Sequence, residues 1–105
     1  SPLLGFYAAV TRQDPQGQPP GGWAPEQAMT REEALRAMTL WAAEAAFLDG
    51  ELGSLRPGKR ADLTACDRDI LKVPAAEILS TRVALTMVNG RIVFESRPQE
   101  GSDAP

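Results

Sequence analysis

The 105-residue sequence contains no histidine and a single cysteine, Cys66. The absence of histidine removes the commonest general base, the commonest zinc ligand and every histidine-based catalytic triad. One cysteine makes neither an internal disulfide nor a thiolate metal site. The residues by themselves therefore indicate no active site, and we expect no catalytic, cofactor-binding or metal-binding residue in this chain.

Long apolar runs and basic clusters are also missing. The most apolar stretch, residues 38–48, is broken by Glu44 and falls short of the roughly 20 residues of a membrane span. No signal peptide is recognisable, so we expect a cytoplasmic protein with no membrane partner. The net charge of −3, with no basic cluster larger than Lys59-Arg60, argues against a nucleic-acid partner.

The composition, 43% apolar and 24% charged, fits one small folded unit, and its patterns predict an α+β fold. Helices are expected over Pro2–Thr11 and over residues 31–47. The second begins at a capping box, in which Thr30 and Glu33 cap each other's backbone, and Gly50 is the expected left-handed C-cap.

Two apolar residues of the second helix, Leu40 and Phe47, fall on its polar side. A second packing partner would explain them, and so would ordinary surface exposure. The sequence leaves both explanations open.

Period-2 patterns replace the helical spacing after Gly50. A short strand is expected over 61–67, and Pro74 could begin one helical turn. Runs 83–88 and 91–95 predict a hairpin closed by Asn89-Gly90, because both turn positions need a positive φ.

Residues 14–25 form a loop by composition, with Trp23 as the only large apolar side chain. We interpret Trp23 as the anchor that holds this loop to the body; the alternative is a residue at the rim of a pocket. Gly17, Gly21 and Gly22 lack the strand and helix start that a phosphate loop requires.

Two carboxylate pairs and one cysteine are candidates for chemistry. Asp67 with Asp69, and Glu32 with Glu33, are the closest carboxylate pairs, but capping explains the second and nothing places the first in a cleft. Cys66 has no histidine or lysine nearby to lower its pKa, so we interpret it as a small core residue.

Three stretches carry a family resemblance: residues 1–14 with Pro-Gly-Gly-Trp at 20–23, the helix entry at 30–37, and Gly-Ser-Leu-Arg-Pro-Gly-Lys-Arg-Ala-Asp-Leu at 53–63 followed by Val-Asn-Gly-Arg-Ile-Val at 88–93. In this order they resemble the C-terminal region of the amidohydrolase superfamily, in the amidohydrolase family 3 branch with N-substituted formamide deformylase-like enzymes.

The resemblance implies a metal-bearing (β/α)8 barrel joined to a small β-sandwich built from both ends of the chain. Histidines, often a carboxylated lysine, and an aspartate after strand eight would hold a divalent metal, with zinc expected, and activate water for attack on an amide carbon. Residues 1–50 would then be the last helices and loop of the barrel, 51–96 the C-terminal part of the sandwich, and 97–105 a polar tail.

On this resemblance the chain is the C-terminal region of a metal-dependent hydrolase of non-peptide carbon–nitrogen bonds, such as amides or formamides. The start at Ser1-Pro2 suggests a processed or partial chain, inactive alone, with the rest of the parent enzyme as its partner. Strands around Leu63, Leu85 and Ile92 would lack their partners, so we expect self-association. The alternative is a stand-alone α+β module for packing or self-association without hydrolase activity.

The tail ends in Gly-Ser-Asp-Ala-Pro at 101–105, which is similar to the family's metal-binding aspartate motif. In the family that motif precedes the Pro-Leu-Leu-Gly helix, whereas Asp103 follows the last predicted strand. We interpret the match as coincidence.

Overall fold

Helix α1 (Pro2–Thr11) has the bounds that the apolar spacing predicts. A computed structural model describes residues 1–96 of the chain. Pro2 lies in the first turn, where its missing N–H leaves no helical bond unmade. Phe6 and Tyr7 are buried, so the face of α1 that carries them packs against the rest of the molecule.

The second predicted helix is divided into α2 (Arg31–Met38) and α3 (Leu40–Ala45) by a break at Thr39. Thr39 has φ −123° and ψ −92°, outside the helical region, and its hydroxyl donates to the Leu35 carbonyl at 2.7 Å. A hydroxyl bonded to a carbonyl four residues earlier bends helices. The expectation of one helix over residues 31–47 is therefore wrong at its centre.

The left-handed residue that follows α3 is Phe47, so the prediction of a left-handed C-cap at Gly50 is wrong. Phe47 has φ 59°, whereas Gly50 does not have a positive φ. The Phe47 N–H donates to the Glu44 carbonyl at 3.0 Å and the Leu48 N–H to the Ala43 carbonyl at 2.8 Å. These two bonds form a Schellman motif and satisfy carbonyls that the helix end leaves free.

The break also changes which face of the helix is covered. Ala43 is buried, whereas the large apolar side chain of Trp41 belongs to a residue that is 42% exposed. Leu40 is half-buried, and Phe47 is 93% exposed. Partial packing thus explains Leu40, and surface exposure explains Phe47.

Three antiparallel strands form a sheet in the order β1-β2-β3. They are β1 (Leu63–Cys66), β2 (Val83–Val88) and β3 (Arg91–Glu95), and the helical turn α4 (Ala75–Ile78) precedes β2. Asn89 and Gly90 both have positive φ, 50° and 78°, which confirms the predicted hairpin turn. Strand β2, which contains Leu85, is the central strand and pairs on both sides within residues 1–96. The expectation that this strand lacks a partner is therefore wrong, and the edges of the sheet are β1 and β3.

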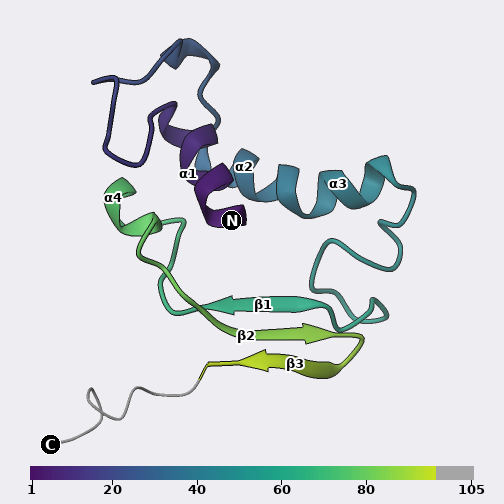
Figure 1. The fold of residues 1–105 in the computed structure, drawn as a ribbon. Helices are drawn as coiled ribbons and strands as arrows, with labels where there is room; N and C mark the ends of the chain where they lie inside the picture. Colours follow the sequence, from purple (N-terminus) through teal and green to yellow (C-terminus); the bar gives the residue numbers. More distant parts are fainter. Residues whose placement is uncertain (97–105) are drawn as a thin grey trace, which may run out of the picture.

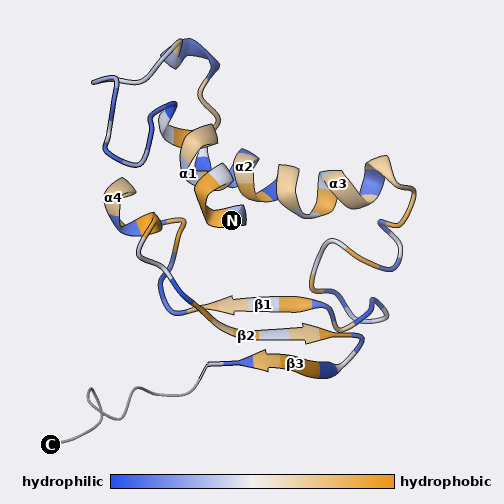
Figure 2. Ribbon diagram, in the orientation of Figure 1, coloured by the Kyte–Doolittle hydropathy of each residue, from blue (hydrophilic) through white to orange (hydrophobic). Residues whose placement is uncertain are grey.

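The helices and the sheet lie in separate halves of the molecule (Figure 1). The buried core consists of Phe6, Tyr7, Ala34 and Ile78, and so joins α1, α2 and α4. Orange apolar segments also lie on the strands, away from that core (Figure 2). None of the helices within residues 1–96 is long and apolar enough to cross a membrane.

Arg31, the first residue of α2, bridges the two halves. Its Nη1 donates to the carbonyl oxygens of Ile70, at 3.0 Å, and Val73, both in the loop between β1 and α4. This side chain fixes the start of α2 to the segment that leads out of the sheet.

Candidate functional site

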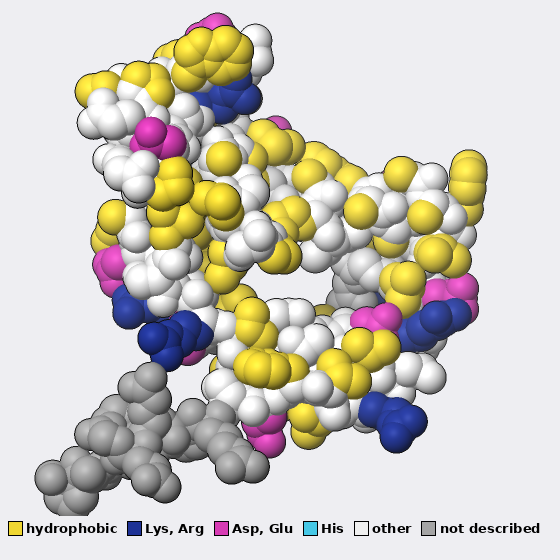
Figure 3. Space-filling view, in the orientation of Figure 1, with side chains coloured by type: hydrophobic (Ala, Val, Ile, Leu, Met, Phe, Trp, Pro, Cys, Tyr) yellow, Lys and Arg dark blue, Asp and Glu magenta, His cyan; other side chains and the backbone are white. Residues whose placement is uncertain are grey.

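A hollow of about 1130 Å³ separates the sheet from α2 and α3. Figure 3 shows it as an opening between the helices above and the strands below. Apolar side chains line it from both sides, among them Met38, Ala42, Leu48, Leu63, Leu71 and Met87. The two layers therefore present apolar surface to each other without packing together.

The charged side chains that line this hollow have partners of their own. Asp62 Oδ1 accepts the Asn89 N–H at 2.6 Å, and Asp69 Oδ1 accepts the Leu71 N–H at 3.0 Å. Arg68 Nη1 donates to Glu77 Oε1 at 2.7 Å. These groups hold turns and ends of elements in place, so the hollow suits an apolar occupant.

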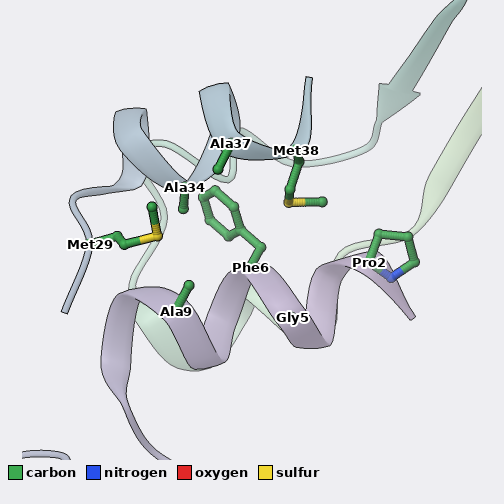
Figure 4. Close-up of a pocket in the computed structure, with 8 residues that line it drawn as sticks. All are labelled: Pro2, Gly5, Phe6, Ala9, Met29, Ala34, Ala37 and Met38. Atoms are coloured by element: carbon green, nitrogen blue, oxygen red, sulfur yellow. The ribbon is translucent and has the colours of Figure 1, made fainter. Parts of the chain in front are cut away.

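A smaller cavity of about 330 Å³ lies between α1 and α2. Figure 4 shows the Phe6 ring pointing from α1 toward Ala34 and Ala37 of α2, with Met29 and Met38 on either side. Among residues 1–96, no titratable side chain lines this cavity. It has no group that could act as an acid, a base or a nucleophile.

The two carboxylates considered as an acid–base pair, Asp67 and Asp69, serve separate backbone contacts. Asp67 Oδ1 accepts the Arg82 N–H at 2.8 Å, which fixes the start of β2 beside the end of β1. Asp69 closes the turn at Leu71. Both residues are exposed, and the structure gives each a structural role.

Glu33 completes the capping box that the sequence predicted. Its Oε1 accepts the Thr30 N–H at 2.9 Å, and its own N–H donates to Thr30 Oγ1 at 3.1 Å. The hydrogen bonds from the backbone and hydroxyl of Thr30 lower the pKa of Glu33. The neighbouring Glu32 pairs with Arg36 at 2.8 Å, so the two carboxylates do not act together.

Cys66 is half-buried at the end of β1, where it lines the hollow. Burial raises the pKa of its thiol, and the Asp67 carboxylate raises it further. Both effects disfavour the thiolate, which is the nucleophilic form.

Trp23 lies against Arg12, which caps the end of α1. The Arg12 guanidinium lies 4.9 Å from the centre of the indole ring, and Arg12 Nε donates to the Trp23 carbonyl at 2.9 Å. The Trp23 N–H donates back to the Arg12 carbonyl at 2.9 Å. Trp23 thus ties the loop to α1, as interpreted, although its side chain is 68% exposed. It lines neither the hollow nor the α1–α2 cavity.

The three glycines of this loop serve backbone turns. Gly17, Gly21 and Gly22 all have positive φ, and a Cβ on Gly22 would lie 2.5 Å from the Thr11 carbonyl oxygen. Gly22 lets the loop approach the end of α1.

The connector, residues 46–62 between α3 and β1, contains two residues of the family motif whose structural roles the sequence did not indicate. Lys59 Nζ donates to Ser54 Oγ at 2.8 Å and to the Leu52 carbonyl at 3.4 Å. Gly53 has φ +95°, and a Cβ on it would lie 2.8 Å from that of Ala43. Gly53 thus lets the connector approach α3, and Lys59 holds the connector in its turn. The sequence motif contains both residues, but their contact partners depend on the fold.

The residues present do not fit a catalytic metal. Within residues 1–96 no three His, Cys, Asp or Glu side chains are grouped so that they could hold an ion. The sequence contains no histidine, and Asp103 lies outside the described residues. Three protein ligands are the usual minimum for catalytic zinc.

The model of the amidohydrolase family matches residues 1–94. The chain is 36% identical to the N-substituted formamide deformylase of Arthrobacter pascens over 95 residues, which cover 90% of this chain and 17% of the relative. It is 36% identical over 75 residues to a 5-methylthioadenosine/S-adenosylhomocysteine deaminase of Symbiobacterium thermophilum, covering 63% of this chain and 17% of the deaminase.

The crystal structure of an amidohydrolase from Thermotoga maritima MSB8 is also similar, with a TM-score of 0.57 and 25% identity over 70% of this chain and 18% of that one. The chain thus spans about a sixth of the length of these relatives. Sequence and structure agree that this chain belongs to the amidohydrolase family.

Proposed function

We propose that the chain is the C-terminal region of a metal-dependent amidohydrolase that hydrolyses carbon–nitrogen bonds other than peptide bonds, such as those of amides or formamides. The family match and the names of the relatives, a deformylase and a deaminase, support this reaction class. Residues 1–50 would belong to the barrel domain and 51–96 to the β-sandwich. The metal ligands would lie in the rest of the parent enzyme, which would be the partner of this chain.

The family match over residues 1–94 carries the proposed reaction class. The apolar hollow between the sheet and α2–α3 supports the proposal that the chain is part of a larger enzyme. Protein interiors pack as densely as organic crystals, so an independently folding domain packs its apolar surfaces against each other. A cavity of about 1130 Å³ is far larger than the voids of a packed core. Further parts of a larger enzyme would fill it.

In such an enzyme these residues would support the site and not react. Asp62 and Asp69 of the hollow accept hydrogen bonds from backbone N–H groups of turns, and both burial and the Asp67 carboxylate disfavour the thiolate of Cys66. Arg31 holds the start of α2 to the loop after β1, Gly53 lets the connector approach α3, and Lys59 holds the connector in its turn. The chain would act by positioning the barrel helices against the sheet.

A chimera tests the proposal. Residues 1–94 would replace the matched 95-residue segment of the Arthrobacter pascens deformylase. We expect the chimera to hydrolyse an N-substituted formamide, and the same deformylase without any replacement segment to be inactive. The 105-residue chain alone, dialysed against zinc, should release no formate.

Two results would contradict the proposal. One is a folded, metal-loaded chimera without activity, while the parent deformylase is active in the same assay. The other is hydrolysis by the 105-residue chain with stoichiometric zinc; if Asp103→Ala abolished both, the tail motif would be a metal ligand after all.

A further inference from the structure

The turn between β2 and β3, Asn89-Gly90, lies beside the residues that lead into β1 (Figure 1). Asn89 is the only asparagine in the sequence, and both turn residues are exposed. The Gly90 N–H donates to the Ala61 carbonyl at 3.0 Å, and the Asn89 N–H donates to Asp62 Oδ1 at 2.6 Å. These two hydrogen bonds attach the turn to the start of β1.

An asparagine followed by glycine reacts with its own backbone over time. The Gly90 nitrogen loses its proton and attacks Asn89 Cγ, so that a bond from Cγ to this nitrogen forms. The bond from Cγ to Nδ2 breaks, and Nδ2 leaves as ammonia with a proton that balances the one lost by Gly90. Glycine favours this step because it has no Cβ to hinder the approach of its nitrogen.

The product of this step is a cyclic imide, which water opens in one of two ways. Attack of water at Cγ gives aspartate, and attack at the backbone carbonyl carbon of residue 89 gives isoaspartate. In both cases the hydroxyl of the water adds to the carbon and its proton returns to the Gly90 nitrogen. The net change is the replacement of a neutral amide by a carboxylate, with water consumed and ammonia released.

The hydrogen bonds of the turn oppose the first step. The Gly90 nitrogen must give up its bond to the Ala61 carbonyl before it attacks. The Asp62 carboxylate is bonded to the neighbouring N–H, and a nearby negative charge disfavours the anion that Gly90 forms. We propose that Asn89 is a deamidation site, and that the bonds to Ala61 and Asp62 suppress the reaction until the turn separates from the start of β1.

Deamidation would weaken the contact that protects the asparagine. Aspartate at position 89 adds a negative charge to the residue whose N–H the Asp62 carboxylate already binds. Isoaspartate adds an atom to the backbone of a two-residue turn, and such turns fix the register of the strands that they join. The reacting atoms and the groups that hold them all lie within residues 61–90, so the inference is independent of the proposed hydrolase function.

Incubation of the 105-residue chain in mildly alkaline buffer tests the proposal. Ion-exchange chromatography measures the species with the new carboxylate, and peptide mapping assigns it to residue 89 and separates aspartate from isoaspartate. A group that reacts only in an opened form reacts in proportion to the population of that form. We therefore expect deamidation in buffer to be about tenfold slower, or slower still, than deamidation of the same chain in concentrated urea.

Asp62→Ala removes the acceptor of the Asn89 N–H and should speed deamidation of the folded chain about threefold or more. Asp67→Ala is the matched control. It removes an equally exposed carboxylate that accepts the Arg82 N–H at 2.8 Å, at the other end of β1. This control should leave the rate within about twofold of the original, because the Asn89 turn keeps both of its bonds.

Circular dichroism before incubation identifies a variant that fails to fold, and the comparison with urea needs only the original chain. Equal rates in buffer and in urea overturn the proposal. So does a slower reaction in Asp62→Ala, which would make Asp62 a base that assists the attack. Equal acceleration by Asp62→Ala and Asp67→Ala also overturns it, because the effect would then come from opening of the whole sheet.

Discussion

Arg31 makes the side-chain contacts that join the helical half to the loop leaving the sheet. Its guanidinium donates to two carbonyl groups, and hydrogen bonds from charged donors contribute about 1.5–3 kcal/mol. We expect Arg31→Met to lower the free energy of unfolding by about that amount, measured by urea denaturation. Arg36→Met, which removes only an exposed ion pair, is the control and should change it by less than about 0.5 kcal/mol. Equal losses in the two variants would argue against the bridging role of Arg31.

Phe47 combines a left-handed backbone with an exposed aromatic side chain. The left-handed conformation is unfavourable for residues with a Cβ and unstrained for glycine. Phe47→Gly should therefore raise the free energy of unfolding by about 0.5–1 kcal/mol. Phe47→Ala keeps the Cβ and should change it little, so thermal unfolding of both variants separates backbone strain from loss of the ring. A destabilised glycine variant would show that the ring contributes to the fold.

Glu33 should make the stability of the folded chain depend on pH, through the start of α2. Its pKa is lowered in the folded chain, so the folded state favours the carboxylate more than the unfolded state does. The stabilisation is present above the ordinary value of 4.5 and is lost as the pH falls through the lower folded pKa. Glu33→Gln cannot ionise, so the melting temperature of the original chain minus that of this variant should shrink between about pH 6 and pH 3. A difference that stays constant with pH would contradict this prediction.

Residues whose partners lie close in sequence were the predictable ones. The capping box needs only Thr30 and Glu33, and the hairpin turn needs only Asn89-Gly90, so local chemistry identified both. Arg31 binds carbonyls about 40 residues further along the chain, and no local pattern indicates such a contact.

At the scale of elements, the join between α3 and β1 depends on close packing at Gly53. An added Cβ would lie 2.8 Å from the Cβ of Ala43 and 3.0 Å from the Cα of Leu40, at φ +95°. We expect Gly53→Ala to cost about 2–4 kcal/mol in urea denaturation, from steric overlap together with backbone strain. Gly58 has φ +90° but open space around it, so Gly58→Ala should cost only about 1 kcal/mol. Similar losses at both positions would mean that α3 and the connector adjust freely.

The element that the sequence misplaced was the long helix. Apolar spacing continues through Thr39, so periodicity alone predicts an unbroken helix over 31–47. After the break, Ala43 of α3 lies against Gly53 of the connector. Helical spacing in the sequence does not indicate such a tertiary contact. The roles of the candidate carboxylates also depend on tertiary structure. The sequence shows their spacing, but their backbone partners, such as Arg82 for Asp67, are set by the folded sheet.

For the whole molecule, the separation of sheet and helices predicts unequal stability. The buried core joins α1, α2 and α4, whereas the strands have no fully buried residue. Native-state hydrogen exchange should therefore show backbone amides of β1–β3 exchanging at least about tenfold faster than those of α1 and α2. Equal protection in both halves would show that the sheet and the helices open together.

The family was predictable from the sequence because its motifs are contiguous, and the match over residues 1–94 confirms it. The hollow was not, because it depends on the distance between two layers and not on any local pattern.

That hollow also couples the stability of the chain to its surroundings. The folded chain has this hollow and the unfolded chain does not, so an occupant that binds only the folded form stabilises it. By mass action, an occupant present at a hundred times its dissociation constant adds about 2.7 kcal/mol to the free energy of unfolding. The melting temperature of this chain therefore rises with the concentration of a molecule that binds between the sheet and the helices. At equal concentrations, the size of the thermal shift ranks such molecules by affinity without any assay of catalysis.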